Sequence, residues 1–199
     1  AHELYLSVAG ALANRIPKDK AHYLQIAKDQ WTWFDNSGMI NSDNLINDGL
    51  DSNCKNNNGL TWSYNQGVVL GGLTELYYAT GDKNYLKRAS TIAKAAIKAL
   101  SNEHGVLVEI NKCEFDGGHC GQDGQQFKGI FVRNLRYLHE AAPDAQFRKF
   151  ILTNADAIWN KDRDTLNRMG ASWDGPYFEA KGPSHSSAMD PLVAAIAAA

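Results

Sequence analysis

The chain has 199 residues, of which 44% are hydrophobic and 21% are charged, a composition typical of a water-soluble globular protein. Its 20 basic and 22 acidic residues give a net charge of −2, so it lacks the basic excess that nucleic acids and anionic membranes attract. No apolar run reaches the roughly 18 to 20 residues of a membrane span. We therefore expect one domain over residues 1–199, with no nucleic-acid partner and no membrane span.

Apolar residues recur three and four positions apart through most of the sequence, which is the spacing of a helix with one buried face. In chain order this pattern covers residues 4–12, 24–34, 69–76, 86–100, 127–138 and 147–158, and an alanine-rich segment near Leu192 completes seven helices. Only residues 106–110 have the pattern of a short strand. Pro191 predicts that the last helix begins late, with Asp190 as its N-cap. The sequence thus predicts an all-α fold.

A turn followed by a helix start recurs at a fixed interval. Each copy has an aspartate and then an aromatic residue, and the successive aromatic residues Tyr23, Tyr85 and Phe147 are 62 residues apart. The aspartate is expected to cap the second helix of a pair, which makes the repeating unit an antiparallel helix hairpin. The connections between hairpins, over residues 35–60, 101–125 and 161–184, are long. In a ring of hairpins they all lie at one end, which is the candidate binding surface.

The three cysteines bear on the cellular compartment. Cys113 and Cys120 flank a glycine-rich loop that a disulfide could close, and Cys54 is left over. His119 lies between the first two, so zinc is the alternative, but the sequence has neither the C-x2-C pair nor the histidine spacing of a zinc finger. We favour a Cys113–Cys120 disulfide, no metal, no cofactor and a secretory setting. The chain begins without a secretion leader, which we expect to have been removed or to lie upstream.

The second hairpin opens with a block that suits a sugar ligand. Residues 61–67 read TWSYNQG and place Trp62, Tyr64, Asn65 and Gln66 at a helix start on the long-loop face. A hydroxyl and two amides can hydrogen-bond sugar hydroxyls, and an indole offers a platform for the apolar face of a sugar ring. The alternative is structural, with the amides capping helix ends, Ser63 as the cap and Trp62 in the core. The residues themselves favour neither interpretation.

The sequence resembles glycoside hydrolase family 76. The resemblance rests on TWSYNQG at residues 61–67, LYYATGD at residues 76–82 and QFKGIFVR at residues 126–133, and it covers essentially the whole chain. Shorter matches are ELYL at residues 3–6, NDG at residues 47–49 and HSSA at residues 185–188. The family contains endo-α-1,6-mannanases and related fungal cell-wall proteins. The resemblance implies an (α/α)6 toroid, in which six helix hairpins form a ring with the substrate groove at one end.

The length of the chain predicts that only part of this ring is present. Six hairpins of this repeat length would need about 370 residues, whereas the sequence supplies three hairpins and one further helix. We therefore expect about half of the ring, matching the C-terminal part of the family's domain. Its open side would be covered by the missing N-terminal half or by a second copy of the chain.

The resemblance also implies a retaining mechanism with two adjacent aspartates as nucleophile and acid/base, and no Asp-Asp pair occurs in these residues. A retaining glycosidase needs two carboxyl groups about 5 to 5.5 Å apart. Asp48, in the family's Asp-Gly position, is the best match to an additional active-site acid, although NDG is also a strong turn signal. The other candidate carboxyls are Asp51, Glu109, Glu114, Asp116, Asp123 and Asp174.

We interpret the sequence as a secreted or cell-wall-associated glycoside hydrolase-like protein that acts on α-1,6-linked mannan or manno-oligosaccharides. Its groove would combine Asp48 with the substrate-binding residues Trp62, Tyr64, Asn65, Gln66, Asp123, Lys128 and Trp173. The predicted disulfide would hold the loop ahead of Asp123 and Lys128. The alternative is a non-catalytic module that binds mannan or serves in assembly.

Overall fold

The computed structural model describes residues 2–115 and 120–198. In this part of the chain, seven helices of 14 to 18 residues carry the fold: α1 (His2–Arg15), α2 (Lys20–Asn36), α3 (Ser63–Thr80), α4 (Lys83–Leu100), α6 (Phe127–Ala141), α7 (Ala145–Lys161) and α8 (Gly182–Ala198). The short helix α5 (Gly121–Gly124) and the 3₁₀ turns η1 (Pro17–Asp19) and η2 (Cys113–Phe115) lie in connections. All seven helices expected from the sequence are confirmed.

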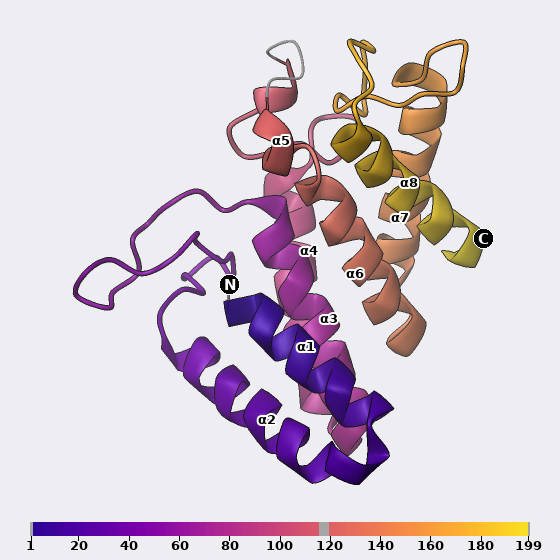
Figure 1. The fold of residues 1–199 in the computed structure, drawn as a ribbon. Coiled ribbons are helices and arrows are strands. Elements are labelled where there is room, and N and C mark those ends of the chain that lie inside the picture. Colours follow the sequence, from indigo (N-terminus) through magenta and orange to yellow (C-terminus); the bar gives the residue numbers. More distant parts are fainter. Residues whose placement is uncertain (1, 116–119, 199) are drawn as a thin grey trace.

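The helices pair into hairpins that stand side by side. α1, α3, α6 and α8 contact one another in that order as an inner row, and α2, α4 and α7 pack outside them. Figure 1 shows the three long connections at one end of the helices and the short connections at the other. This is the arrangement of helix hairpins in an (α/α)6 toroid, with about half of the ring present. Among the described residues, no helix is both long and apolar enough to cross a membrane.

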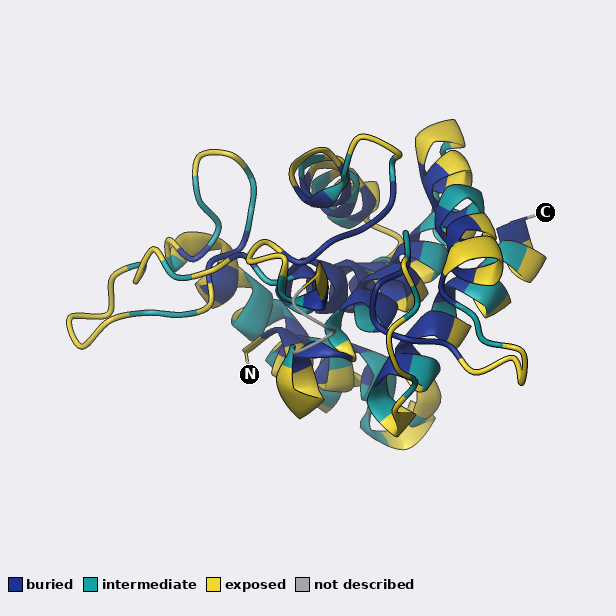
Figure 2. Cartoon of the chain, turned by 90° about the horizontal axis from the view of Figure 1, so that it is seen from above, coloured by how far each residue is buried: buried dark blue, intermediate teal, exposed yellow. Residues whose placement is uncertain are grey.

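The core lies where the inner and outer helices face one another. Seen from the loop end in Figure 2, buried residues gather between the helices, whereas the outer helix faces and the loop tips are exposed. The largest fully buried side chains include Phe34 of α2, Leu70 of α3 and Phe131 of α6. The apolar spacing of the sequence therefore identified the buried faces of α3, α4, α6 and α7. It did not identify that of α1, where Leu4 and Val8 are exposed and Leu6 is buried instead.

Two local expectations are wrong. Residues 106–110 form no strand but an isolated antiparallel bridge between Leu107 and Ser101, and the N–H of Leu107, which faces away from that partner, donates to the side chain of Asn154 on α7 at 2.8 Å. α8 begins at Gly182, so Pro191 lies inside the helix and not at its start. In the first turn of this earlier start, the hydroxyl of Ser184 accepts the N–H of Lys181, the residue before the helix, at 2.9 Å.

The expected aspartate caps are present in two of the three hairpins. Asp82 and Asp144 each accept a backbone N–H in the first turn of α4 and α7. Asp19 occupies the same position before α2, but its side chain makes no cap hydrogen bond. The 3₁₀ turn η1 leads directly into α2 in this hairpin, so the first copy of the repeat enters its second helix differently.

Glycine allows the inner helices to approach closely. At Gly67 on α3, an added Cβ would lie 2.4 Å from the Cα of Phe131 on α6. At Gly129 on α6, it would lie 2.6 Å from the Cα of Ser187 on α8. Both close neighbours are backbone atoms, which cannot rotate away as the end of a side chain can. A side chain at either position would force two inner helices apart.

Gly67→Ala is therefore expected to destabilise the protein by about 3 kcal/mol, the upper end of the usual cost of overpacking. Gly182→Ala is the matched control, because an added Cβ there meets nothing within 4 Å and the residue opens a helix. Urea unfolding of both variants measures the difference. Equal stabilities for the two variants would contradict this account of the inner row.

Candidate functional site

The long connection before α3 is fixed by buried side-chain amides. The amide of Gln66 accepts the N–H of Ile46 and donates to the Ile46 carbonyl, both at 2.8 Å. The neighbouring Asn47 accepts from the side chain of Asn56 at 3.0 Å. Asp48 comes directly after these two anchored residues and is exposed. The position of Asp48 is thus set by the start of α3.

Three aromatic rings meet where α3 and α6 begin, and we call Trp62, Tyr64 and Phe127 the aromatic cluster. The ring centroids of Tyr64 and Phe127 are 4.4 Å apart, and those of Trp62 and Phe127 are 5.5 Å apart. Trp62 and Tyr64 are half-buried, so part of each side chain remains at the surface. Such rings can pack against the apolar face of a ligand.

Polar groups border the aromatic cluster. Asn65 is buried and donates to Glu3 of α1 at 3.1 Å. Burial raises the pKa of the Tyr64 hydroxyl, a hydrogen bond with Asn65 lowers it, and the charges of Asp48 and Glu3 raise it. These influences show that the groups lie close together. The structure therefore unites four predicted site residues, Asp48, Trp62, Tyr64 and Asn65, with Glu3, which did not appear among the predicted site residues.

Lys128 and Trp173 lie inside the protein. The ammonium of Lys128 pairs with Glu114 at 3.0 Å, donates to the Ala171 carbonyl at 2.8 Å and lies 4.6 Å from the ring centroid of Trp173. Both side chains are more than nine-tenths buried. They join two of the long connections to α6, so their polar and aromatic groups serve the protein itself. Asp123 is exposed on α5.

Gln66 is also engaged internally. Besides its two bonds to Ile46, the amide donates to the Trp62 carbonyl at 3.0 Å, and the residue is fully buried. Gln66 therefore has a structural role, whereas Trp62 and Tyr64 remain partly exposed at the surface. Successive residues of a helix point in different directions, so the start of α3 directs Gln66 inward and Tyr64 toward the surface.

Gln66→Ala is expected to cost about 1 to 3 kcal/mol of stability, because the buried N–H and carbonyl of Ile46 lose their partner. Gln25→Ala is the matched control, since Gln25 is exposed on α2 and bonds only across one helical turn to Asp29. Thermal melts of both variants provide the comparison. A Gln66→Ala melting temperature equal to that of the control would show that this anchor is dispensable.

Three buried carboxyl groups lie near the ammonium of Lys128, and we call Glu109, Glu114, Lys128 and Asp162 the buried charge cluster. Glu109 accepts the N–H of Ser63 at 3.1 Å and also the Ser63 hydroxyl. Glu114 accepts the N–H of Glu109 at 3.0 Å with the same oxygen that pairs with Lys128. Asp162 is fully buried just after α7. The cluster joins the starts of α3 and α6 to two long connections.

Burial raises the pKa of Glu109 to about 7, although the hydrogen bonds from Ser63 and the charge of Lys128 act to lower it. Burial likewise raises the pKa of Asp162 to about 7, although the positive charge of Lys128 acts to lower it. Glu109 and Glu114 are among the candidate catalytic carboxyl groups predicted from the sequence, and Asp162 is not. An acidic residue inside the apolar run 106–110 was the available signal for Glu109.

Stability should fall as the pH rises from about 4 to about 7. The folded chain keeps protons on Glu109 and Asp162 up to about pH 7, whereas unfolded carboxyl groups release them near pH 4. Unfolding therefore releases protons throughout this window. The groups whose pKa is lowered, including Asp144 and Asp174, act in the opposite sense at lower pH. The contribution of the buried pair is thus best measured between pH 5 and pH 7.5.

Asp162→Asn should reduce this pH dependence by about half, because asparagine does not titrate. Asp156→Asn, on the exposed face of α7, is the control and should keep the slope of the wild-type protein. The measurement is the melting temperature at several pH values across the window. An unchanged slope in Asp162→Asn would show that Asp162 does not hold its proton there.

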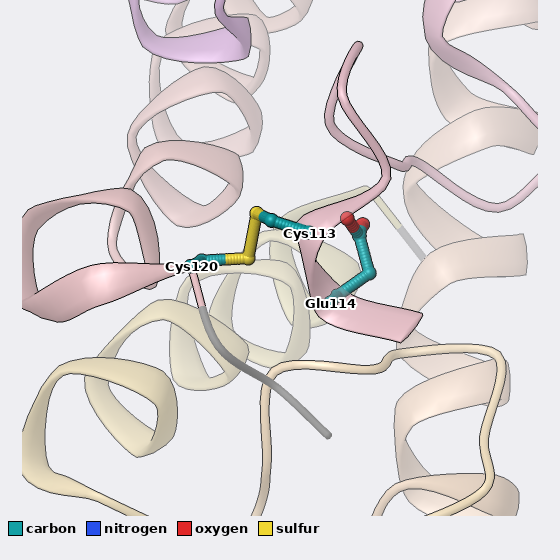
Figure 3. Close-up of side chains that lie close together, drawn as sticks. All are labelled: Cys113, Glu114 and Cys120. Carbon is teal, nitrogen blue, oxygen red and sulfur yellow. A yellow bond between two sulfur atoms is a disulfide. The ribbon is translucent and has the colours of Figure 1, made fainter. Parts of the chain in front are cut away.

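The cysteine loop is cross-linked as the sequence predicted. Cys113 and Cys120 form a disulfide, and Figure 3 shows it beside Glu114. The ligand atoms of these three residues lie within 4.8 Å of one another, a spacing that a metal ion could use. The two sulfur atoms are bonded to each other, however, and are not free thiolate ligands. Asp116 and His119, which entered the sequence-based alternatives, lie outside the described residues.

Helix hairpins that stand side by side in a partial ring, with their long connections at one end, define the (α/α)6-toroid class of protein. Within that class, the family model described as glycosyl hydrolase family 76 matches residues 5–197. The chain therefore belongs to glycosyl hydrolase family 76.

Curated relatives with significant similarity are fungal. Mannan endo-1,6-α-mannosidase DFG5 of Saccharomyces cerevisiae is 31% identical over 125 residues, which are 61% of this chain and 27% of that protein. Mannan endo-1,6-α-mannosidase DCW1 of Eremothecium gossypii is 30% identical over 132 residues, 63% of this chain and 28% of that protein. The matched stretches thus span less than a third of each relative.

Solved structures share the fold. The GH76A α-1,6-mannanase of Salegentibacter sp. superposes with a TM-score of 0.77 at 24% identity, covering 97% of this chain and 58% of that one. Dfg5 of Chaetomium thermophilum superposes with a TM-score of 0.80 at 20% identity, covering 99% of this chain and 50% of that one. This chain spans about half the length of each solved relative.

Proposed function

We propose that this chain forms the sugar-binding part of a glycoside hydrolase that acts on α-1,6-linked mannan. The observation that carries the proposal is the aromatic cluster at the loop end, with Asp48 and Asn65 beside it. Trp62 and Tyr64 would contact the apolar face of a mannose ring, and the carboxylate of Asp48 would accept hydrogen bonds from its hydroxyls. A related Salegentibacter α-1,6-mannanase, solved as an inactive variant with α-1,6-mannotriose, supports this ligand class.

The covalent step of a retaining mechanism requires a nucleophile and a proton donor about 5 to 5.5 Å apart. Asp48 is the candidate acid beside the aromatic cluster, and the adjacent aspartates that the family resemblance implies do not occur in this sequence. We therefore assign to Asp48 the binding and orientation of the sugar. The nucleophile and the proton donor are not assigned to residues of this chain.

The two ends of the inner row fit a larger ring. α1 has an exposed apolar stripe of Leu4, Tyr5 and Val8, and α8 has another of Met189, Val193 and Ile196. As part of the proposal, these stripes pack against further helices, supplied by another part of the same protein or by a second copy. The solved relatives, about twice as long as this chain, support such a completion.

We place the protein outside the cytosol, secreted or associated with a cell wall. The Cys113–Cys120 disulfide supports this, because such bonds persist in oxidising compartments. The fungal mannan endo-1,6-α-mannosidases among the relatives support it as well, since mannan is their named substrate.

A non-catalytic mannan-binding module is the second candidate. The missing Asp-Asp pair favours it, because a chain without the nucleophile can still bind the polymer. Release of reducing ends from α-1,6-mannan separates the two candidates. The purified chain would release them only if it supplies both carboxyl groups of the reaction.

Calorimetric titration of the chain with α-1,6-mannotriose tests the binding site. Trp62→Ala is expected to weaken binding about tenfold, or about 1.4 kcal/mol, because it removes the apolar platform. Asp48→Asn is expected to weaken binding severalfold, because the amide keeps only one acceptor oxygen. Trp159→Ala, at an exposed tryptophan on the outer helix α7, is the control and should bind as the wild type does. No binding by the wild type, or equal losses in both tryptophan variants, would refute the site.

A further inference from the structure

The buried charge cluster reaches the candidate sugar site at Ser63. This residue is the first of α3 and lies between Trp62 and Tyr64. Its N–H and its hydroxyl both bond to the carboxylate of Glu109, which comes from the connection between α4 and α6. Ser63 and Glu109 are almost completely buried, at 0% and 1% exposure. One carboxylate from a distant part of the chain thus holds the start of the helix that carries two proposed sugar contacts.

The capping of α3 is unusual in its source. The first N–H groups of a helix need acceptors, which the N-cap residue ordinarily supplies when it is Ser, Thr, Asp or Asn. The N-cap of α3 is Trp62, which makes no side-chain cap bond. Glu109 supplies the acceptor instead, and its negative charge suits the positive end of the helix. Because Glu109 supplies the acceptor, the N-cap position can hold Trp62, whose aromatic side chain remains partly exposed.

Glu109 is itself held in place. The N–H of Glu109 donates to a carboxylate oxygen of Glu114, and that oxygen also pairs with the ammonium of Lys128. Glu114 follows Cys113, whose disulfide to Cys120 lies beside it (Figure 3). Lys128 follows Phe127, the third ring of the aromatic cluster. A continuous series of polar contacts therefore runs from Ser63 on α3 to Lys128 on α6, and each of these residues is next to a ring of the aromatic cluster.

Building on the function proposed above, we propose that Glu109 is a positioning residue of the sugar site, which fixes Trp62 and Tyr64 against Phe127 through the start of α3. The ionised carboxylate accepts both bonds from Ser63, whereas the protonated group has to give up acceptor capacity. Ligand binding should therefore strengthen as Glu109 ionises.

The ionisation of Glu109 falls in an accessible range, since burial raises its pKa to about 7. The charged and titratable groups facing it are Glu114 from its own connection and Lys128 from α6, and Tyr64 follows its partner Ser63 on α3. Asp162, at the end of α7, acts on the same ammonium and also titrates near pH 7. Any pH effect must therefore be assigned to Glu109 and not to Asp162 by substitution.

Hydrogen–deuterium exchange tests the anchoring without any ligand. In Glu109→Ala, amides at the start of α3 should exchange at least tenfold faster than in the wild type. Glu103→Gln, at an exposed glutamate of the same connection, is the control and should leave exchange unchanged. Wild-type exchange at the start of α3 in Glu109→Ala would overturn the proposal. If Glu109→Ala does not fold, Glu109→Gln carries the test through the binding measurement below.

Titration with α-1,6-mannotriose at pH 6 and pH 8 tests the positioning. The wild type and Asp162→Asn should bind severalfold more tightly at pH 8, whereas Glu109→Gln should bind equally at both pH values and severalfold more weakly than the wild type at pH 8. Wild-type affinity and pH dependence in folded Glu109→Gln would mean that Glu109 only stabilises the fold, and would overturn the proposal. If the wild type binds no mannotriose, the proposed function fails and the sugar-site role with it, while exchange still decides whether Glu109 fixes α3.

Discussion

The backbone contact between α3 and α6 sets the geometry on which the candidate site depends. The contact lies at Gly67 and Phe131, each four residues, or about one helical turn, after Ser63 and Phe127. The separation of the two helices is therefore fixed one turn below the aromatic cluster. On the other side of α3, Gly72 packs against α1, where an added Cβ would lie 2.8 Å from the Cγ of Leu6, and α1 carries Glu3 to Asn65 at the site. Helix packing thus decides which side chains meet at the loop end.

The buried charge cluster connects the long connections to the starts of the helices. Buried ion pairs rarely add net stability, because the desolvation of the charges offsets their attraction. Here one ammonium faces three carboxyl groups, and the excess negative charge is relieved by the raised pKa of Glu109 and Asp162. The bonds of Glu109, Glu114 and Lys128 join the connections after α4 and α7 to the starts of α3 and α6.

The sequence predicted the helices well because helical periodicity is a local property. Most apolar stripes coincide with the buried face of their helix, as Leu73 and Phe131 show, although the stripe of α1 at Leu4 and Val8 is exposed. The roles of polar residues were harder to predict, since they depend on groups far away in the chain. Gln66 bonds to a residue 20 positions earlier, and Lys128 bonds to a carbonyl 43 positions later. Local rules also overestimated the strand at residues 106–110, where the pairing is an isolated bridge to Ser101 and the outward N–H of Leu107 donates to Asn154, 47 positions later.

The anchor between Gln66 and Ile46 has a consequence for how the connection before α3 can vary. Isolated bridges between Ile40 and Ile46 and between Leu50 and Asn56 close one tight turn on each side of the anchor. The long connection therefore behaves as two short loops that share a fixed point, and lengthening either tip adds little closure entropy. Insertions or exchanges at these tips would reshape the rim beside Asp48 while α3 keeps its place. The rim beside Asp48 can therefore change in length and composition without repacking of the helices.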